Sequence, residues 1–142
     1  MEIKHAMTKR VMVIGPDATI KNAAGIMTKY RVGCLVVMED NKLVGILTEL
    51  DIIWKVVAGD LNPNTTKVSD VMTKKVLTIQ ANKTLEDATH IMVENKIKKL
   101  PVLEGDKLVG IITATDLISV QPKMIESLAK LMLFEEKKPV AG

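Results

Sequence analysis

The sequence predicts an α/β (α+β) fold: two copies of a β-α-β-β-α unit packed about a pseudo-two-fold axis, followed by one further helix. First, residues 7–53 align without a gap to residues 72–118, and twenty of the forty-seven aligned pairs are identical. Second, β-rich runs and stretches of helical periodicity follow one another in the same order in both copies. Third, a turn-forming residue pair separates two adjacent apolar runs in each copy, which predicts a hairpin.

Each copy starts with a short β-rich run, at residues 11–14 and 76–79. A helix follows in each, because apolar residues then recur at helical spacing and a threonine stands where an N-cap is expected, at Thr19 and Thr84. The residues that carry this spacing are Ile20, Ala23, Met27 and Tyr30 in the first copy and Leu85, Ala88, Ile91 and Met92 in the second.

The predicted hairpins pair residues 35–38 with 43–47 and residues 100–103 with 108–112. Asp40-Asn41 and Gly105-Asp106 separate these runs, and such pairs tolerate the positive φ angles of tight turns. A second helix is expected in each copy, over about 49–57 and 114–120.

This pattern divides the chain into a first repeat (1–58), a linker (59–67), a second repeat (68–120) and a C-terminal helix and tail (121–142). The last helix is predicted from a stripe that includes Met124, Ile125, Leu128, Leu131 and Met132. It either caps the domain or meets its twin in a dimer.

Composition argues against several classes of protein. The 20 basic and 17 acidic residues are spread along the chain without a cationic block, and aromatic residues make up 2%. Nucleic-acid binding is therefore disfavoured. One cysteine, Cys34, allows no intrachain disulfide, and His5 and His90 lack metal-ligand spacing. With no apolar run near the roughly 18 residues that span a bilayer, we expect no membrane association and a location in the reducing cytoplasm.

The repeated motif G-x-x-T-x-x-D, at Gly45–Asp51 and Gly110–Asp116, carries the candidate chemistry. Glycine allows a close approach to the backbone, and the start of a helix presents unpaired N–H groups, which together suit a phosphate. The acceptor-only carboxylate of Asp51 or Asp116 suits the two hydroxyls of a ribose, and the hydroxyl of Thr48 or Thr113 suits a phosphate oxygen. The alternative is a capping box, which needs no ligand.

Together with the opening DVMTKKVLTI and the hairpin IKKLPVLEGDKLVGIITATDL, this motif resembles the cystathionine-β-synthase (CBS) domain, as a pair over roughly residues 3–120. The resemblance implies two sheets packed together with two related clefts for AMP, ADP, ATP or S-adenosylmethionine. It assigns ribose binding to Asp51 and Asp116 and the hydroxyl contact to Thr48 and Thr113. It also implies a homodimer of two such pairs.

The resemblance places the base pockets at the first strand and at the strand before the hairpin turn. The residues implied are Val11, Met12, Val13, Val32, Gly33 and Cys34 in the first copy and Val76, Leu77, Thr78, Ile97, Lys98, Lys99 and Pro101 in the second. Candidate phosphate cations are Lys9, Arg10, Arg31, Lys74, Lys75 and Lys98.

The two sites are expected to be unequal. Glu49 brings a negative charge to the helix start in the first copy, where the second copy has Ala114. We therefore expect the second site to bind anions better.

The predicted function is a regulatory sensor of adenosyl ligands that acts on an unknown effector protein. The alternative is a ligand-free scaffold in which the Thr/Asp pairs are helix caps. No catalytic activity is expected, since the sequence offers no nucleophile beside a base, no metal cluster and no Walker-type loop.

Overall fold

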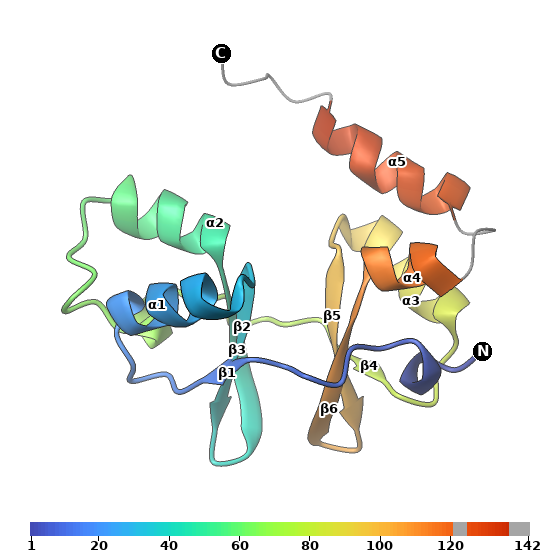
Figure 1. Cartoon of the computed structure of the whole chain (residues 1–142), viewed down its shortest axis with the longest axis horizontal. Coiled ribbons are helices and arrows are strands. Elements are labelled where there is room, and N and C mark those ends of the chain that lie inside the picture. The colour runs from blue at the N-terminus through green and yellow to red at the C-terminus, as the bar shows by residue number, and fades with distance from the viewer. Residues whose placement is uncertain (121–124, 137–142) are drawn as a thin grey trace. The chain divides into compact units, whose positions relative to one another are not determined.

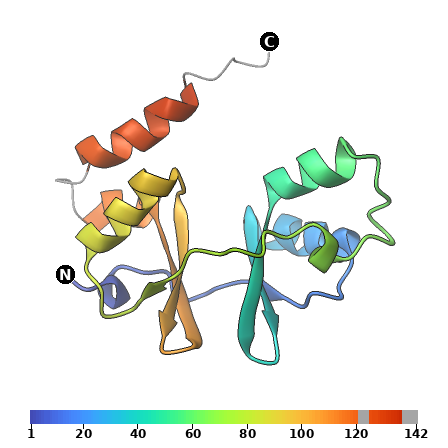
Figure 2. The same ribbon diagram turned by 180° about the vertical axis from the view of Figure 1, so that it is seen from behind.

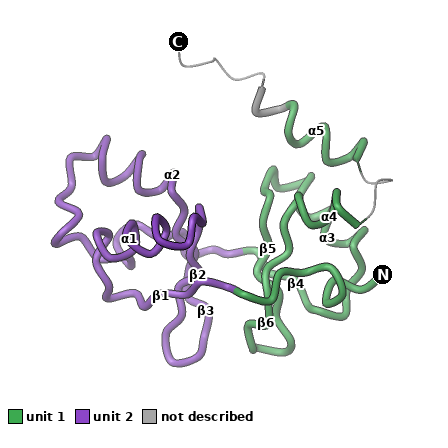
Figure 3. Tube along the Cα trace, in the orientation of Figure 1, with its two compact units in different colours: residues 1–10, 77–142 green, residues 11–76 purple. Residues whose placement is uncertain are grey.

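A computed structural model describes residues 1–120 and 125–136, with side chains described as far as residue 133. The chain forms two compact units (Figure 3). Unit 1 contains residues 1–10 and 77–142, and unit 2 contains residues 11–76. The units therefore do not coincide with the two sequence copies, because the segment that leads into each copy belongs to the unit built by the other copy.

Unit 2 is a three-stranded sheet in the order β1-β2-β3, with β1 parallel and β3 antiparallel to β2 (Figure 1). The helix α1 packs on β2. In chain order the elements are β1 (Val13–Ile14), α1 (Ile20–Tyr30), β2 (Cys34–Glu39), β3 (Lys42–Thr48), α2 (Glu49–Asp51), the π-helix η2 (Ile52–Val57) and the 3-10 turn η3 (Val68–Asp70).

Unit 1 repeats this architecture with the sheet order β4-β5-β6, and Figure 2 shows both sheets from the opposite side. Its elements are the 3-10 turn η1 (Ile3–His5), β4 (Ile79–Gln80), α3 (Leu85–Asn95), β5 (Lys99–Glu104), β6 (Lys107–Thr113), α4 (Ala114–Val120) and α5 (Ile125–Glu136). The α/β prediction with a C-terminal helix is confirmed.

The predicted helix starts are confirmed, because Thr19 accepts a hydrogen bond from the Asn22 N–H and Thr84 from the Asp87 N–H. Met27 and Met92 are buried, as the helical spacing predicts, whereas Tyr30 is exposed at the last turn of α1. Both helices end at a left-handed residue, Arg31 and Lys96. These ends were not predicted, since neither residue is the glycine that usually takes this conformation.

The first strands are shorter than predicted. Residues 11–12 and 76–78 lie outside β1 and β4, so the ranges 11–14 and 76–79 were wrong in extent. In unit 2, the Val36 N–H donates to the Met12 carbonyl. Pro101 occupies the matching position of β5 and has no N–H to donate. This missing donor explains why β4 begins one matched position later than β1.

Both hairpins form as predicted. Asp40 and Asn41 have φ angles of 51° and 62°, and Gly105 has a φ angle of 63°. The second helix of the first copy covers the predicted residues 49–57, but from Ile52 onwards it is a π-helix. In unit 1, α4 matches its predicted range and α5 packs against α3 and α4, burying Leu128 and Leu131. Met124, which was placed on this last stripe, lies outside the described residues.

Candidate functional site

The repeated Thr/Asp pairs form the same local structure in both units. Thr48 N–H donates to Asp51 Oδ2 at 3.0 Å and Asp51 N–H donates to Thr48 Oγ1 at 3.2 Å. In unit 1, the corresponding bonds between Thr113 and Asp116 are both 3.0 Å. Both pairs are therefore complete capping boxes, which the sequence suggested as the alternative to ligand binding. A carboxylate has about four acceptor positions. The hydrogen bond that each carboxylate accepts within the box therefore leaves it able to accept others.

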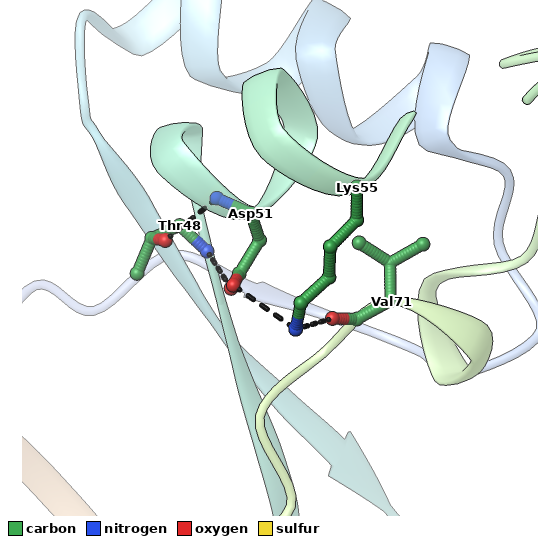
Figure 4. Close-up of polar contacts among 4 residues, drawn as sticks. All are labelled: Thr48, Asp51, Lys55 and Val71. Atoms are coloured by element: carbon green, nitrogen blue, oxygen red, sulfur yellow. Dashed lines mark hydrogen bonds and ion pairs between the residues drawn. The ribbon is translucent and has the colours of Figure 1, made fainter. Parts of the chain in front are cut away.

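Asp51 has a second, cationic partner. Its Oδ1 lies 3.3 Å from Lys55 Nζ, and the same ammonium donates to the Val71 carbonyl at 2.8 Å (Figure 4). Asp51 is 8% exposed, so water screens its end of the ion pair weakly. Lys55 was not among the predicted site residues, although its i, i+4 spacing from Asp51 is a recognisable signal.

Asp116 faces a hydroxyl instead. Thr8 Oγ1 lies 3.5 Å from Asp116 Oδ1 and 3.4 Å from Oδ2. Both distances are at the long limit for a hydrogen bond. Asp116 is half-buried, and no ion pair is formed with it by the residues that the structure describes. Thr8 was also missed as a site residue, since it is remote in sequence and reaches the site through the leading segment of the chain.

The space beside each of the two motif glycines is filled by atoms of the protein itself. A Cβ on Gly45 would lie 2.5 Å from Met72 Sδ and 3.0 Å from the Thr73 carbonyl oxygen, and one on Gly110 would lie 2.6 Å from Met7 Sδ and 2.9 Å from the Thr8 carbonyl oxygen. Residues 8 and 73 each form a bridge to the last strand of the sheet in their unit. The group that approaches each glycine is thus the leading segment, whereas the sequence analysis expected a phosphate there.

The strand before each hairpin turn lies beside its Thr/Asp pair. Glu49 N–H donates to the Gly33 carbonyl at 2.9 Å, and Ala114 N–H donates to the Lys98 carbonyl at 2.8 Å. The predicted base-pocket residues Gly33 and Lys98 are therefore next to the start of the second helix. Of the other predicted site residues, Ile97, Lys99 and Pro101 belong to the same strand region of unit 1 as Lys98, and Cys34 begins β2.

Exposure differs among these residues. Val13 is 49% exposed, Pro101 is buried, and Thr78 and Ile97 are half-buried. Cys34 is also half-buried. Val76, which was grouped with the second pocket, belongs to unit 2.

The charges at the two helix starts differ as the sequence analysis expected. A Cβ on Gly33 would lie 3.0 Å from Glu49 Oε1, so the Glu49 carboxylate lies against the backbone of Gly33. In unit 1, the matching residues are Lys98 and the buried Ala114. The candidate cations Lys9 and Arg10 belong to unit 1, and Arg31, Lys74 and Lys75 belong to unit 2.

A shallow groove of about 390 Å³ lies within unit 1, beside β4 and the first half of α3. Of the predicted site residues, Thr78 lines it. Its other lining residues are Ile79, Gln80, Lys83, Asp87, His90 and Ile91. The backbone N–H of Thr84 is the main cause that lowers the pKa of Asp87 below its ordinary value. Asp87 is thus engaged as a helix cap at the groove wall.

Other residue types give little indication of chemistry. His5 is exposed, and His90 Nε2 lies 3.3 Å from Glu94 Oε1 on the surface of α3. Within residues 1–120 and 125–136 no group of histidine, cysteine or acidic side chains could hold a metal ion. Nor does any helix in this part of the chain have the length and apolar character to cross a membrane. Trp54 is 64% exposed.

Comparison with known proteins identifies related chains. The family model for the CBS domain matches residues 2–58 and 68–123. The CBS domain-containing protein YhcV of Bacillus subtilis is 36% identical over 115 residues, which cover 81% of each chain. Hypoxic response protein 1 of Mycobacterium tuberculosis is 30% identical over 115 residues, covering 80% of each. A hexameric CBS-CP12 protein from bloom-forming cyanobacteria superposes with a TM-score of 0.75 at 29% identity, covering 89% of this chain and 73% of that one.

Proposed function

Because this chain belongs to the CBS-domain family, we propose that it is a regulatory module that binds an adenosyl ligand, namely AMP, ADP, ATP or S-adenosylmethionine. Ligand occupancy then alters the affinity of the chain for an effector protein. Such a ligand shifts a conformational equilibrium only by the difference between its affinities for the two states.

The observation that supports this proposal is the carboxylate of Asp116. Its Oδ2 accepts a hydrogen bond from the Thr113 N–H, and the Thr8 hydroxyl lies 3.4–3.5 Å from its two oxygens, the other side-chain contact that the described residues make with it. A carboxylate held in place, to which no residue of the described part of the chain forms an ion pair, retains acceptor positions for two ribose hydroxyls. Lys98 takes the place of Gly33 at this helix start, where its carbonyl accepts a hydrogen bond from the Ala114 N–H.

A ligand-free scaffold is the second candidate, and it has its own supporting observation. Both Thr/Asp pairs are complete capping boxes, and the pair Thr84/Asp87 has the same geometry, with bonds of 3.0 and 3.1 Å, at a position that the motif does not include. A capping box by itself is therefore no evidence of a ligand.

Thermal unfolding with each of the four adenosyl compounds separates the two candidates. At about 100-fold above the dissociation constant, a ligand should stabilise the wild type by roughly 2.7 kcal/mol. Asp116→Ala should abolish this gain. Asp87→Ala is the matched control, because it removes an equivalent cap and should leave the gain intact. Absence of stabilisation by all four compounds would favour the scaffold.

We also propose that two copies of the chain associate through an apolar ridge on unit 2, formed by Leu50, Ile53, Trp54 and Val57. All four side chains are exposed, and Ile53, Trp54 and Val57 are more than half exposed. At matched positions the second copy has Thr115 in place of Leu50 and Ser119 in place of Trp54, both suited to solvent. An uncharged ridge of this kind is self-complementary under a two-fold axis. The hexameric state named for the cyanobacterial relative supports assembly within the family.

Sedimentation of the double variant Leu50→Thr/Trp54→Ser tests this interface. We expect the variant to sediment as a monomer at concentrations where the wild type is a dimer. Leu133→Ser, which changes an exposed residue of α5, should leave the dimer intact. Dissociation by Leu133→Ser alone would place the interface on α5 and contradict the proposal.

A further inference from the structure

The two units differ at one position that determines which group lies next to the Oδ1 oxygen of the aspartate. Lys55 in unit 2 corresponds to Val120 in unit 1, by the same shift that pairs Asp51 with Asp116. The capping boxes themselves are alike to within 0.2 Å. The residues beside the box, and not the box, therefore distinguish the two units.

The ammonium group of Lys55 has two partners. Its ammonium lies between Asp51 Oδ1, at 3.3 Å, and the carbonyl of Val71, at 2.8 Å (Figure 4). It thereby ties the second helix of the first copy to the segment that leads into the second copy. A bond between an ammonium and a carboxylate is stronger than one from a neutral hydroxyl. A ribose hydroxyl approaching Asp51 would have to displace the stronger donor.

We infer that Lys55 acts as an internal lock, which closes the Asp51 carboxylate to outside ligands and restricts the chain to one nucleotide, bound at Asp116. This inference rests on the proposed function and goes beyond it by naming the residue that makes the sites unequal. Glu49 reinforces the lock, because its carboxylate lies against Gly33 at the same helix start and repels a phosphate.

Calorimetric titration with ATP and with AMP tests this inference, because it measures the number of nucleotide-binding sites per chain. The wild type should bind one nucleotide per chain, and Asp116→Ala should abolish binding while Asp51→Ala leaves it unchanged. Lys55→Val, which installs the residue of unit 1, should raise the number to two. Lys55→Met keeps the apolar stem of the side chain and should give the same result if Lys55→Val folds poorly. Lys21→Val, at an exposed lysine of α1, should keep one site.

The reciprocal variant installs the lock in unit 1. Val120→Lys should weaken nucleotide binding by about tenfold or more, as expected when a charge-assisted bond competes for the carboxylate. Two sites in the wild type, one of them lost in Asp51→Ala, would overturn the inference. So would a single site that persists in both Lys55→Val and Lys55→Met.

A second measurement needs no nucleotide. Hydrogen exchange at amides 71–73 should accelerate at least about tenfold in Lys55→Met, because the side chain that fastens the Val71 carbonyl is lost. Unchanged exchange would refute the lock. If no adenosyl ligand binds any variant and exchange still accelerates, the proposed function fails while the closure of Asp51 by Lys55 stands.

Discussion

The two units share a capping box and differ in what surrounds it. In unit 2 the buried Asp51 is paired with Lys55, and in unit 1 the half-buried Asp116 faces the Thr8 hydroxyl. Duplication has thus kept the interactions that each helix start needs, while the neighbouring positions have diverged. The comparison teaches that two copies of one motif can form the same capping box and still meet different neighbouring groups.

The same contrast extends to the surfaces of the units. In unit 1, α5 covers part of α3 and α4, and the matched residues Thr115 and Ser119 are polar. In unit 2 the corresponding helix exposes Leu50 and Trp54. The units are therefore alike in their cores and unlike beside the capping boxes and on these surfaces.

The largest loss of stability is expected from substitutions in the hydrophobic cores, and it should be similar in the two units. Leu35 and Leu100 occupy matched positions in the central strands, and both are completely buried. Leu35→Ala and Leu100→Ala should each lower the free energy of unfolding by about 2–5 kcal/mol, through lost burial and a residual cavity. Urea denaturation measures this, with the exposed Leu61→Ala as a control that should change little. A loss of stability in only one of these two variants would show that the two cores are not equivalent.

An intermediate effect is expected at the motif glycines. Gly45→Ala and Gly110→Ala should each destabilise the chain by about 1–3 kcal/mol, because the new methyl group meets a methionine and a backbone carbonyl that cannot both move away. Gly25→Ala is the control. Apart from its chain neighbours and the backbone of its own helix, no atom lies within 4 Å of the position of its Cβ, and alanine is favoured over glycine inside α1. Stability unchanged by Gly110→Ala would mean that the leading segment does not pack there.

The smallest effect concerns the pH dependence of the two first helices. The pKa of Asp87 is lowered, mainly by the hydrogen bond from the Thr84 N–H, whereas α1 has the uncharged Asn22 at the matching position. A lowered pKa in the folded state stabilises above the ordinary pKa, and this stabilisation is lost as the pH falls through the lowered value. Asp87→Asn should therefore flatten the loss of stability in acid.

The reciprocal Asn22→Asp should complete a capping box in α1 and steepen the same loss. Urea unfolding of wild type and both variants between neutral pH and pH values below the ordinary pKa of 3.8 measures the difference. Parallel pH profiles for the wild type and Asp87→Asn would contradict the assignment.

Much of the fold followed from local patterns. Thr19 and Thr84 marked helix starts because a cap depends on residues within three positions of it. Asp40-Asn41 and Gly105 marked turns because positive φ is a property of single residues. Both first strands were predicted too long. The later start of β4 depends on Pro101, which lies in a strand remote in sequence. The Thr/Asp pairs were found, and both the ligand and the cap interpretations were stated, but local sequence could not decide between them.

The sequence by itself determined the order of elements, the repeat and the position of each carboxylate, because spacing and propensity act over a few neighbouring residues. Tertiary structure alone decided that each leading segment joins the unit of the other copy, that methionines fill the space beside Gly45 and Gly110, and that Val71 and Thr8 reach the two aspartates. These contacts join residues far apart along the chain, so they depend on the path of the backbone, which no local pattern encodes.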